Sequence, residues 1–222
     1  MQRRQLAKKK LLRLYRFIIN YKDYKFQCMK KDVILAGVGG QGILSIAAAI
    51  GLAAVEAGLY LKQAEVHGMS QRGGAVQSHL RLSDQPIASD LIPKGACDMI
   101  LSVEPMESLR YLPYLAAGGW LVTSSRSIEN IPDYPAQEAL FNEIRKVRNH
   151  LIIDAYGIAR DLGSQKVSNM VMLGAAAANL GLEVAMLDAS LQQLFGRKGE
   201  EVVRMNQDAI RAGGEAALAG GS

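Results

Sequence analysis

The spacing of hydrophobic residues between positions 29 and 222 changes repeatedly, and it predicts alternating strands and helices. Short uninterrupted apolar runs are typical of buried parallel strands, and they occur at 32–36, 99–103, 120–123 and 151–155. Longer stretches that are rich in alanine or have helical periodicity predict helices at 43–57, 104–115, 135–147, 157–162, 168–180, 188–195 and 199–218. This alternation predicts a three-layer α/β/α fold with a Rossmann-like, doubly wound, mostly parallel sheet and a helical C-terminal region.

The segment 59–92 departs from this alternation. Residues 59–66 can form a second strand, and residues 75–82 alternate between apolar and polar positions, as expected of a strand with two different faces. Ser83-Asp84-Gln85-Pro86 is a turn signal, after which 87–92 is expected to return as a hairpin partner. We therefore expect a β-hairpin near 75–92 and a mixed sheet.

Composition excludes several classes of protein. The 222 residues are 49% hydrophobic and 21% charged, which supports a large buried core and excludes a disordered chain. No apolar run reaches the roughly 18 to 20 residues that cross a bilayer. The two cysteines, Cys28 and Cys97, exclude a disulfide scaffold, and they are too few for this chain alone to hold an iron–sulfur cluster or a structural zinc ion. The chain is interpreted as a soluble protein of a reducing compartment.

The positive charge is concentrated at the N-terminus. Residues 1–28 hold nine Lys or Arg residues and one acid, whereas residues 29–222 hold 17 bases and 20 acids. A nucleic-acid-binding protein would need a basic face on its folded domain, and the sequence predicts none. We interpret 1–28 as a basic N-terminal extension outside the fold and 29–222 as one folded domain. A transit peptide or a surface-binding amphipathic helix remains an alternative for the extension.

A glycine-rich loop at 37–42 (GVGGQG) follows the first predicted strand and opens a helix. This pattern permits a tight turn that brings an anion close to the helix N-terminus. A dinucleotide site also needs an acid at the end of the second strand, about 20 residues on, and neither Glu56 nor Glu65 fits that position well. An alternative is that the glycines simply let strand and helix pack closely. The predicted ligand-binding residues here are Gly37, Gly39, Gly40, Gln41 and Gly42.

The richest stretch for chemistry is 65–79 (EVHGMSQRGGAVQSH). Paired glycines beside an arginine form a flexible turn that carries an anion-binding guanidinium. Loops at the carboxyl ends of parallel strands line a common crevice, so this loop is expected to share a rim with the glycine loop. A solvated loop is the alternative, and no complete catalytic machinery is visible. The candidates are His67 and Arg72 as catalytic contributors and Gln71, Gly73 and Gly74 as ligand-binding residues.

The two motifs together resemble a known family. GVGGQGIL, QAEVHGMSQRGGAVQSHLRLSD and the stretch 169–175 are similar to the gamma-type domain of the 2-oxoacid:ferredoxin oxidoreductases over residues 29–218. Within that family, EVHGMSQRGG looks like the small (beta) subunits that act with indolepyruvate. Three alternatives stay open: the gamma subunit of a pyruvate or 2-oxoisovalerate enzyme, a free-standing NAD- or flavin-binding protein, and a non-enzymatic binding or regulatory module.

The resemblance implies a subunit that is not active alone. A large (alpha) partner subunit would carry thiamine diphosphate, Mg and the iron–sulfur clusters, and this chain would hold no cofactor. The complex would convert arylpyruvates and coenzyme A to aryl-acetyl-CoA and carbon dioxide, with electrons passed to ferredoxin. Residues 39–42 would take an anionic group such as a coenzyme A phosphate, and His67, Gln71 and Arg72 would contact partner and substrate. The family also implies anaerobic metabolism in the cytoplasm, with neither nucleic acid nor membrane as partner.

Overall fold

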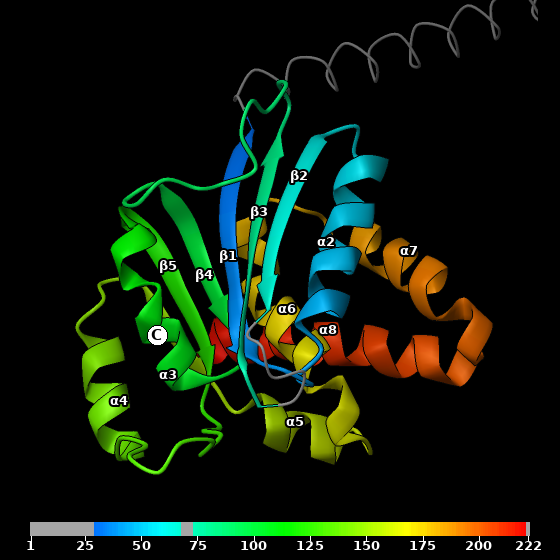
Figure 1. Ribbon diagram of the computed structural model, residues 1–222. Helices are drawn as coiled ribbons and strands as arrows, with labels where there is room; N and C mark the ends of the chain where they lie inside the picture. The colour runs from blue at the N-terminus through cyan, green and yellow to red at the C-terminus, as the bar shows by residue number, and fades with distance from the viewer. Residues whose placement is uncertain (1–28, 68–72, 221–222) are drawn as a thin grey trace, which may run out of the picture.

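Six strands form one mixed sheet in the computed structural model, which describes residues 29–67 and 73–220 (Figure 1). The strand order is β2-β3-β1-β4-β5-β6. Strands β1, β4, β5 and β6 are parallel, whereas β3 is antiparallel to both β1 and β2. The bounds are Lys30–Val38 for β1, Tyr60–His67 for β2, Ala75–Ser83 for β3, Cys97–Ser102 for β4, Leu115–Ser124 for β5 and His150–Ile153 for β6.

Helices cover both faces of the sheet, which confirms the predicted three-layer α/β/α class (Figure 1). Successive residues of a strand point to opposite faces, so Val33 and Leu35 of β1 enter one apolar core and Ile34 enters the other. The first core lies under α2 (Ile43–Glu56), α5 (Ala155–Asp161), α6 (Ser168–Leu180), α7 (Val184–Phe195) and α8 (Glu200–Gly220). The second lies under α3 (Pro105–Arg110) and α4 (Gln137–Arg145). Short 3-10 helices span Leu112–Tyr114, Gln165–Val167 and Gly196–Lys198.

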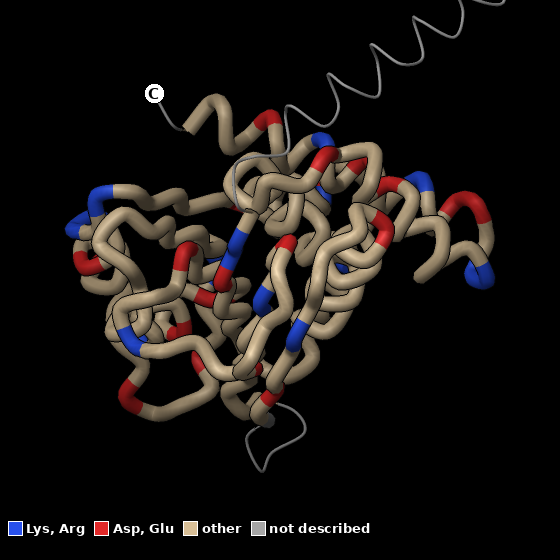
Figure 2. The backbone as a smooth tube through the Cα atoms, turned by 90° about the horizontal axis from the view of Figure 1, so that it is seen from above, with Lys and Arg blue, Asp and Glu red and all other residues tan. Residues whose placement is uncertain are grey.

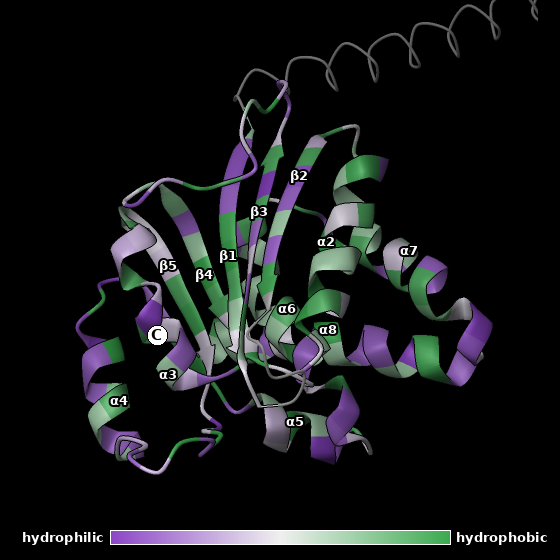
Figure 3. Cartoon of the chain, in the orientation of Figure 1, coloured by the Kyte–Doolittle hydropathy of each residue, from purple (hydrophilic) through white to green (hydrophobic). Residues whose placement is uncertain are grey.

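The hydropathy of the chain follows these layers. Figure 3 shows apolar residues concentrated on the central strands and on the inner sides of the helices. Figure 2 shows Lys and Arg interspersed with Asp and Glu around the described part of the chain. No helix within 29–67 and 73–220 combines the length and the apolar character needed to cross a bilayer. The predicted extension 1–28 falls outside the described residues and stays a prediction.

The prediction that 87–92 returns as the hairpin partner of 75–82 is wrong. Strand β3 pairs with β2 and β1, and 87–92 forms no strand. Instead, side chains of β3 hold this segment across the face of the sheet. The Arg81 guanidinium donates to the backbone carbonyls of Ser89 and Leu91, at 2.9 and 3.2 Å. The backbone groups of 87–92 thus find side-chain partners, and the segment crosses the sheet instead of extending it.

A buried ion pair joins β1 to β3. The carboxylate of Asp32, which is 0% exposed, accepts two hydrogen bonds from Arg81, at 2.7 and 3.1 Å. Lys30 adds a contact at 2.9 Å. A buried carboxylate is tolerated when it is paired and hydrogen-bonded in this way. Because the same arginine also binds the segment after β3, one guanidinium connects both strands and the covering loop.

Helices α6 and α8 approach each other most closely at two glycines. A Cβ atom on Gly174 would lie 2.0 Å from the carbonyl oxygen of Ile210, and one on Gly213 would lie 1.9 Å from that of Val171. Both distances are far below van der Waals contact, so any side chain would push the helices apart. Glycine at these positions therefore allows the close spacing of α6 and α8, two of the five helices on this face of the sheet.

We predict that Gly213→Ala lowers the free energy of unfolding by about 1 to 3 kcal/mol, the usual cost of forcing extra volume into a packed interface. The matched control is Gly214→Ala. A Cβ atom there would lie 3.7 Å from the carbonyl oxygen of Gly174, an ordinary contact, and alanine favours the helix by roughly 1 kcal/mol. Urea unfolding of the two variants measures the difference, and equal stabilities would contradict this account.

Candidate functional site

The glycine loop forms a tight turn between β1 and α2, as predicted. A Cβ atom on Gly37 would lie 2.4 Å from the Val103 side chain, so the loop passes directly against the end of β4. Gly40 and Gly42 have φ angles of +98° and +78°, in the left-handed region that favours glycine. Gly42 is also the residue from which α2 begins. Gly37, Gly40 and Gly42 are thus required by the backbone itself, whatever ligand the loop binds.

The side chain of Gln41 braces this loop. Its Oε1 atom accepts a hydrogen bond from the backbone N–H of Val38 at 2.7 Å, and its Nε2 atom donates to the carbonyl oxygen of Val103 at 3.0 Å. The backbone N–H of Gln41 donates to the Val38 carbonyl at 3.2 Å. Both ends of the amide are therefore already engaged inside the protein. A ligand could use this side chain only by packing against it or by displacing one of these bonds.

The second predicted motif reaches the same rim. The Gly74 carbonyl accepts a hydrogen bond from the Gly39 N–H at 2.8 Å, and the Gly73 carbonyl accepts one from the Asn130 side chain at 2.7 Å. These bonds place Gly73 and Gly74 beside the glycine loop and beside the segment that follows β5. Gln71 and Arg72 lie outside the described residues.

His67 is the last residue of β2, and its backbone is separated from the glycine loop by one strand. It is opposite Val76 of β3, and Val76 is in turn opposite Gly37 of β1. Neighbouring strands are about 4.8 Å apart, so β2 ends roughly 10 Å from the first glycine of the loop.

The acids that a dinucleotide site would need are badly placed. Glu65 lies on β2, on the far side of β3 from the glycine loop, and accepts a hydrogen bond from Gln63 at 3.4 Å. Glu56 is the last residue of α2, about 20 Å along the helix from its first turn. In a dinucleotide-binding fold the ribose acid lies on the strand next to the glycine loop. Neither Glu56 nor Glu65 occupies that position.

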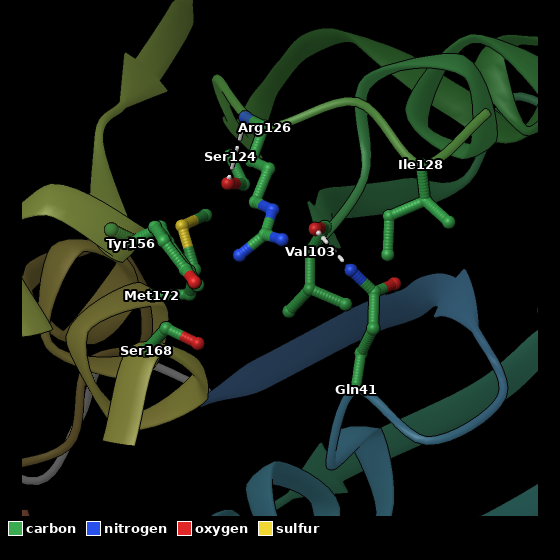
Figure 4. A pocket seen from close by; sticks show the side chains of 9 residues that line it. Gln41, Val103, Ser124, Arg126, Ile128, Tyr156, Ser168 and Met172 are labelled. Atoms are coloured by element: carbon green, nitrogen blue, oxygen red, sulfur yellow. Dashed lines mark hydrogen bonds between the residues drawn. The ribbon is translucent and has the colours of Figure 1, made fainter. Parts of the chain in front are cut away.

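A pocket of about 190 Å³ opens beside the glycine loop, at the carboxyl ends of the parallel strands (Figure 4). Of the predicted site residues, Gln41 alone lines it. Sequence reasoning missed the polar residues that complete it, Arg126, Tyr156 and Ser168. Arg126 and Tyr156 follow directly after two predicted strands, and that position was the signal that could have found them. The lining residues are Gln41, Val103, Ser124, Arg126, Ile128, Ala155, Tyr156, Ser168 and Met172.

A buried glutamate ties the segment after β5 to this edge. Glu104 is 0% exposed, and its Oε2 atom accepts from the Glu107 N–H at 2.8 Å, which caps α3. Its other carboxylate oxygen accepts from the Ile128 N–H at 3.3 Å and from the hydroxyl of Tyr134. Burial and the bond to Glu104 raise the pKa of Tyr134, so this phenol stays protonated as a donor. The network holds 126–134 in place and thereby positions Arg126 at the pocket.

The described residues offer no place for a metal or a reactive thiol. Within 29–67 and 73–220, no group of three or more His, Cys, Asp or Glu side chains could hold a metal ion. Cys97 is fully buried, and burial raises the pKa of its thiol to about 12. A thiol with that pKa is almost entirely protonated at neutral pH and therefore a poor nucleophile.

His79, in the same motif as His67, lies away from the pocket and serves the fold. It is 4% exposed, its Nδ1 atom accepts the Ile92 N–H at 3.0 Å, and its ring packs edge-on against Tyr114. Burial, with a smaller contribution from Arg81, lowers its pKa. The neutral ring is the form that accepts this hydrogen bond, so His79 anchors the covering segment to β3.

We predict that His79 makes the protein less stable in mild acid. Because its folded pKa lies below the unfolded value of 6.5, the unfolded chain takes up the proton first, and stability falls as the pH drops below about 6.5. His79→Asn retains a hydrogen-bond acceptor but does not titrate, so it should lack this part of the loss. Urea unfolding of both proteins between pH 8 and 5 measures the difference, and parallel losses would contradict the assignment.

Comparison with known proteins identifies the family. The model of the pyruvate ferredoxin/flavodoxin oxidoreductase family matches residues 32–216. The indolepyruvate oxidoreductase subunit IorB of Archaeoglobus fulgidus is 31% identical over 201 residues, covering 86% of this chain and 98% of that protein. The IorB subunit of Pyrococcus horikoshii is 36% identical over 162 residues, covering 69% and 80%. This chain belongs to the pyruvate ferredoxin/flavodoxin oxidoreductase family, which confirms the predicted resemblance.

A solved structure agrees in fold. The 2-oxoglutarate:ferredoxin oxidoreductase of Magnetococcus marinus, solved with 2-oxoglutarate, coenzyme A and succinyl-CoA bound, superposes with a TM-score of 0.69 at 23% identity. The match covers 86% of this chain but 31% of that one. The fold described here is therefore one part of that larger oxidoreductase chain.

Proposed function

We propose that this chain is the small subunit of an indolepyruvate:ferredoxin oxidoreductase. In this role it supports the oxidative decarboxylation of arylpyruvates to aryl-acetyl-CoA, with ferredoxin as electron acceptor. The observation that carries the proposal is the match at 31% identity over 98% of an IorB subunit, because it spans that subunit from end to end. The pyruvate and 2-oxoisovalerate alternatives differ in the oxoacid, and a substrate comparison separates them.

The residues of this chain support a proposal in which the large subunit holds the cofactors. The described residues fit neither a metal ion nor an iron–sulfur cluster, and the whole sequence holds two cysteines where such clusters require four ligands. Thiamine diphosphate, Mg and the clusters therefore belong to the large subunit in this proposal, and this chain has no activity alone. The free-standing NAD or flavin alternative is disfavoured by the family match and by the positions of Glu56 and Glu65.

Exposed apolar side chains support a partner surface at the carboxyl rim of the sheet. Leu44 at the start of α2, Val66 near the end of β2 and Ile131 after β5 are 50%, 52% and 45% exposed. Ile131 is next to Asn130, which is bonded to Gly73. Large apolar side chains that share one edge mark an interaction site more often than scattered ones do. Strand β2 ends with His67 at the same rim.

The test is anaerobic reconstitution with the candidate large subunit. Oxoacid- and coenzyme A-dependent reduction of ferredoxin or a viologen dye should require both chains, and indolepyruvate should be preferred to pyruvate, 2-oxoisovalerate and 2-oxoglutarate. A large subunit that is equally active alone and forms no complex would overturn the proposal. A complex that prefers another oxoacid would retain the subunit role but correct the substrate.

We predict that Arg72→Ala lowers turnover of the reconstituted complex about tenfold to a hundredfold, the effect of losing a charge-assisted hydrogen bond to substrate or partner. The variant should unfold at the same urea concentration as the parent protein. Arg145→Ala is the control, because Arg145 lies on α4, which packs on the second core, and pairs with Glu138 at 2.8 Å. Unchanged kcat and KM in the Arg72 variant would remove that residue from the site.

A further inference from the structure

An arginine without an acidic partner projects into the pocket beside the glycine loop (Figure 4). Arg110 and Arg211 pair with Glu107 and Asp188 at 3.0 and 3.1 Å. Like Arg148, Arg197 and Arg204, Arg126 has no carboxylate among the described residues within 4.0 Å of its guanidinium nitrogens, but of these four arginines it is Arg126 that lines the pocket. Its positive charge is therefore available to a ligand.

The Arg126 side chain is exposed, and its guanidinium packs against an aromatic ring. Its central carbon lies 3.6 Å from the centre of the Tyr156 ring, a cation–π stack. Its backbone N–H donates to the Ser124 hydroxyl at 3.2 Å, and the buried Glu104 holds the segment that follows. A cation that is already oriented loses less conformational freedom when it binds an anion.

The rest of the pocket is lined by polar hydrogen-bond donors on one part and by apolar side chains on another. The Ser168 hydroxyl and the Tyr156 ring lie on the same side of the pocket as the guanidinium (Figure 4). Ser168 is the first residue of α6, where helix N–H groups carry partial positive charge. Val103, Ile128 and Met172 supply the apolar surface. A cation and a hydroxyl beside apolar walls suit an oxyanion at the end of an organic ligand.

The size of the pocket limits what it can hold. At about 190 Å³ it is smaller than the roughly 300 to 1,000 Å³ of pockets that enclose a whole small molecule. It therefore accommodates a charged end group, while the rest of the ligand extends past the rim. Leu44 and Ile131 are exposed at this rim, which is the proposed partner surface. The ligand would then lie between the two subunits.

We propose that this pocket binds the terminal carboxylate or phosphate of a ligand of the complex, with Arg126 as the cationic contact and Ser168 as a hydrogen-bond donor. The glycine loop is less suited to the task, because the N–H groups of Gly39 and Gln41 already donate within the protein. The identity of the ligand rests on the proposed function, within which the carboxylate of a 2-oxoacid and a phosphate of coenzyme A are the two sources.

Binding to the full chain tests the pocket itself. Pyrophosphate and phenylpyruvate, titrated separately at low salt by calorimetry, represent the two sources, and the proposal expects saturable millimolar or tighter binding of at least one. Arg126→Ala should weaken that binding about tenfold to a hundredfold. Arg160→Ala should leave it unchanged, because Arg160 is exposed on α5 and pairs with Asp161. No saturable binding of either probe, or equal binding by the Arg126 variant, would overturn the proposal.

Two further variants test whether a loss of binding reflects the proposed contacts or a general disturbance of the fold. Arg126→Lys retains the charge but loses the planar stack and the forked donor geometry, so it should bind with intermediate affinity. Ser168→Ala should weaken binding about twofold to tenfold, the loss of one neutral hydrogen bond. If Arg126→Lys bound as weakly as Arg126→Ala while Ser168→Ala had no effect, the proposed contacts would be wrong.

Kinetics of the reconstituted complex distinguish the two sources. If Arg126→Ala raises the KM for coenzyme A alone, the pocket takes a phosphate. If it raises the KM for the 2-oxoacid alone, the pocket takes the carboxylate. Unchanged KM values in an active complex would overturn the role in the complex. If the two chains do not assemble, the proposed function fails, and the titration of the full chain still decides whether the pocket binds an oxyanion.

Discussion

The arrangement of the site depends on one antiparallel strand, β3, which is hydrogen-bonded between β1 and β2. Gly74, the residue before its first, is bonded to Gly39 of the glycine loop. Because β3 occupies this place, β2 ends roughly 10 Å away from the loop. The same strand therefore brings Gly73 and Gly74 of the second motif to the rim. It also keeps Glu65 of β2 away from the position that the acid of a dinucleotide site occupies. Both consequences follow from backbone pairing alone.

Charged side chains have different partners at the two ends of the sheet. Near the amino end of β1, the buried Asp32 is fully paired with Arg81, and His79 binds the covering segment as a neutral ring. At the carboxyl end, Glu104 is engaged in the fold, but the guanidinium of Arg126 has no described acidic partner. Paired charges thus stabilise the fold near the amino end of β1. Arg126 lies at the opposite end, where doubly wound sheets bind their ligands.

These features agree with the proposed role as a subunit of a larger enzyme. Within the described residues, no group of three or more His, Cys, Asp or Glu side chains could hold a metal ion, and the Cys97 thiol is buried and protonated. The rim of the sheet combines exposed apolar side chains, a braced glycine loop and a small cationic pocket. A surface of that kind is suited to closing over a reaction that takes place on a partner. Membership of the pyruvate ferredoxin/flavodoxin oxidoreductase family accords with this role.

Local sequence determined the elements and the family. Most strand and helix positions follow from hydrophobic spacing, which packing against a sheet imposes directly, and the 168–180 helix was predicted with its observed bounds. The exceptions are 87–92, which forms no strand, and 104–115, where the helix ends at Arg110 and β5 begins at Leu115. The motifs at 37–42 and 65–79 were visible because tight turns demand glycine at fixed positions.

Only the tertiary structure decided which strands pair and which side chains meet. Strand β3 pairs with β1 and β2, and side-chain bonds from His79 and Arg81 hold residues 89–92 in place, which periodicity does not report. The pocket joins Gln41, Arg126 and Ser168 from distant parts of the chain. Each of these residues is unremarkable in its own sequence context, because a binding site depends on proximity in space, and that proximity arises only when the sheet assembles.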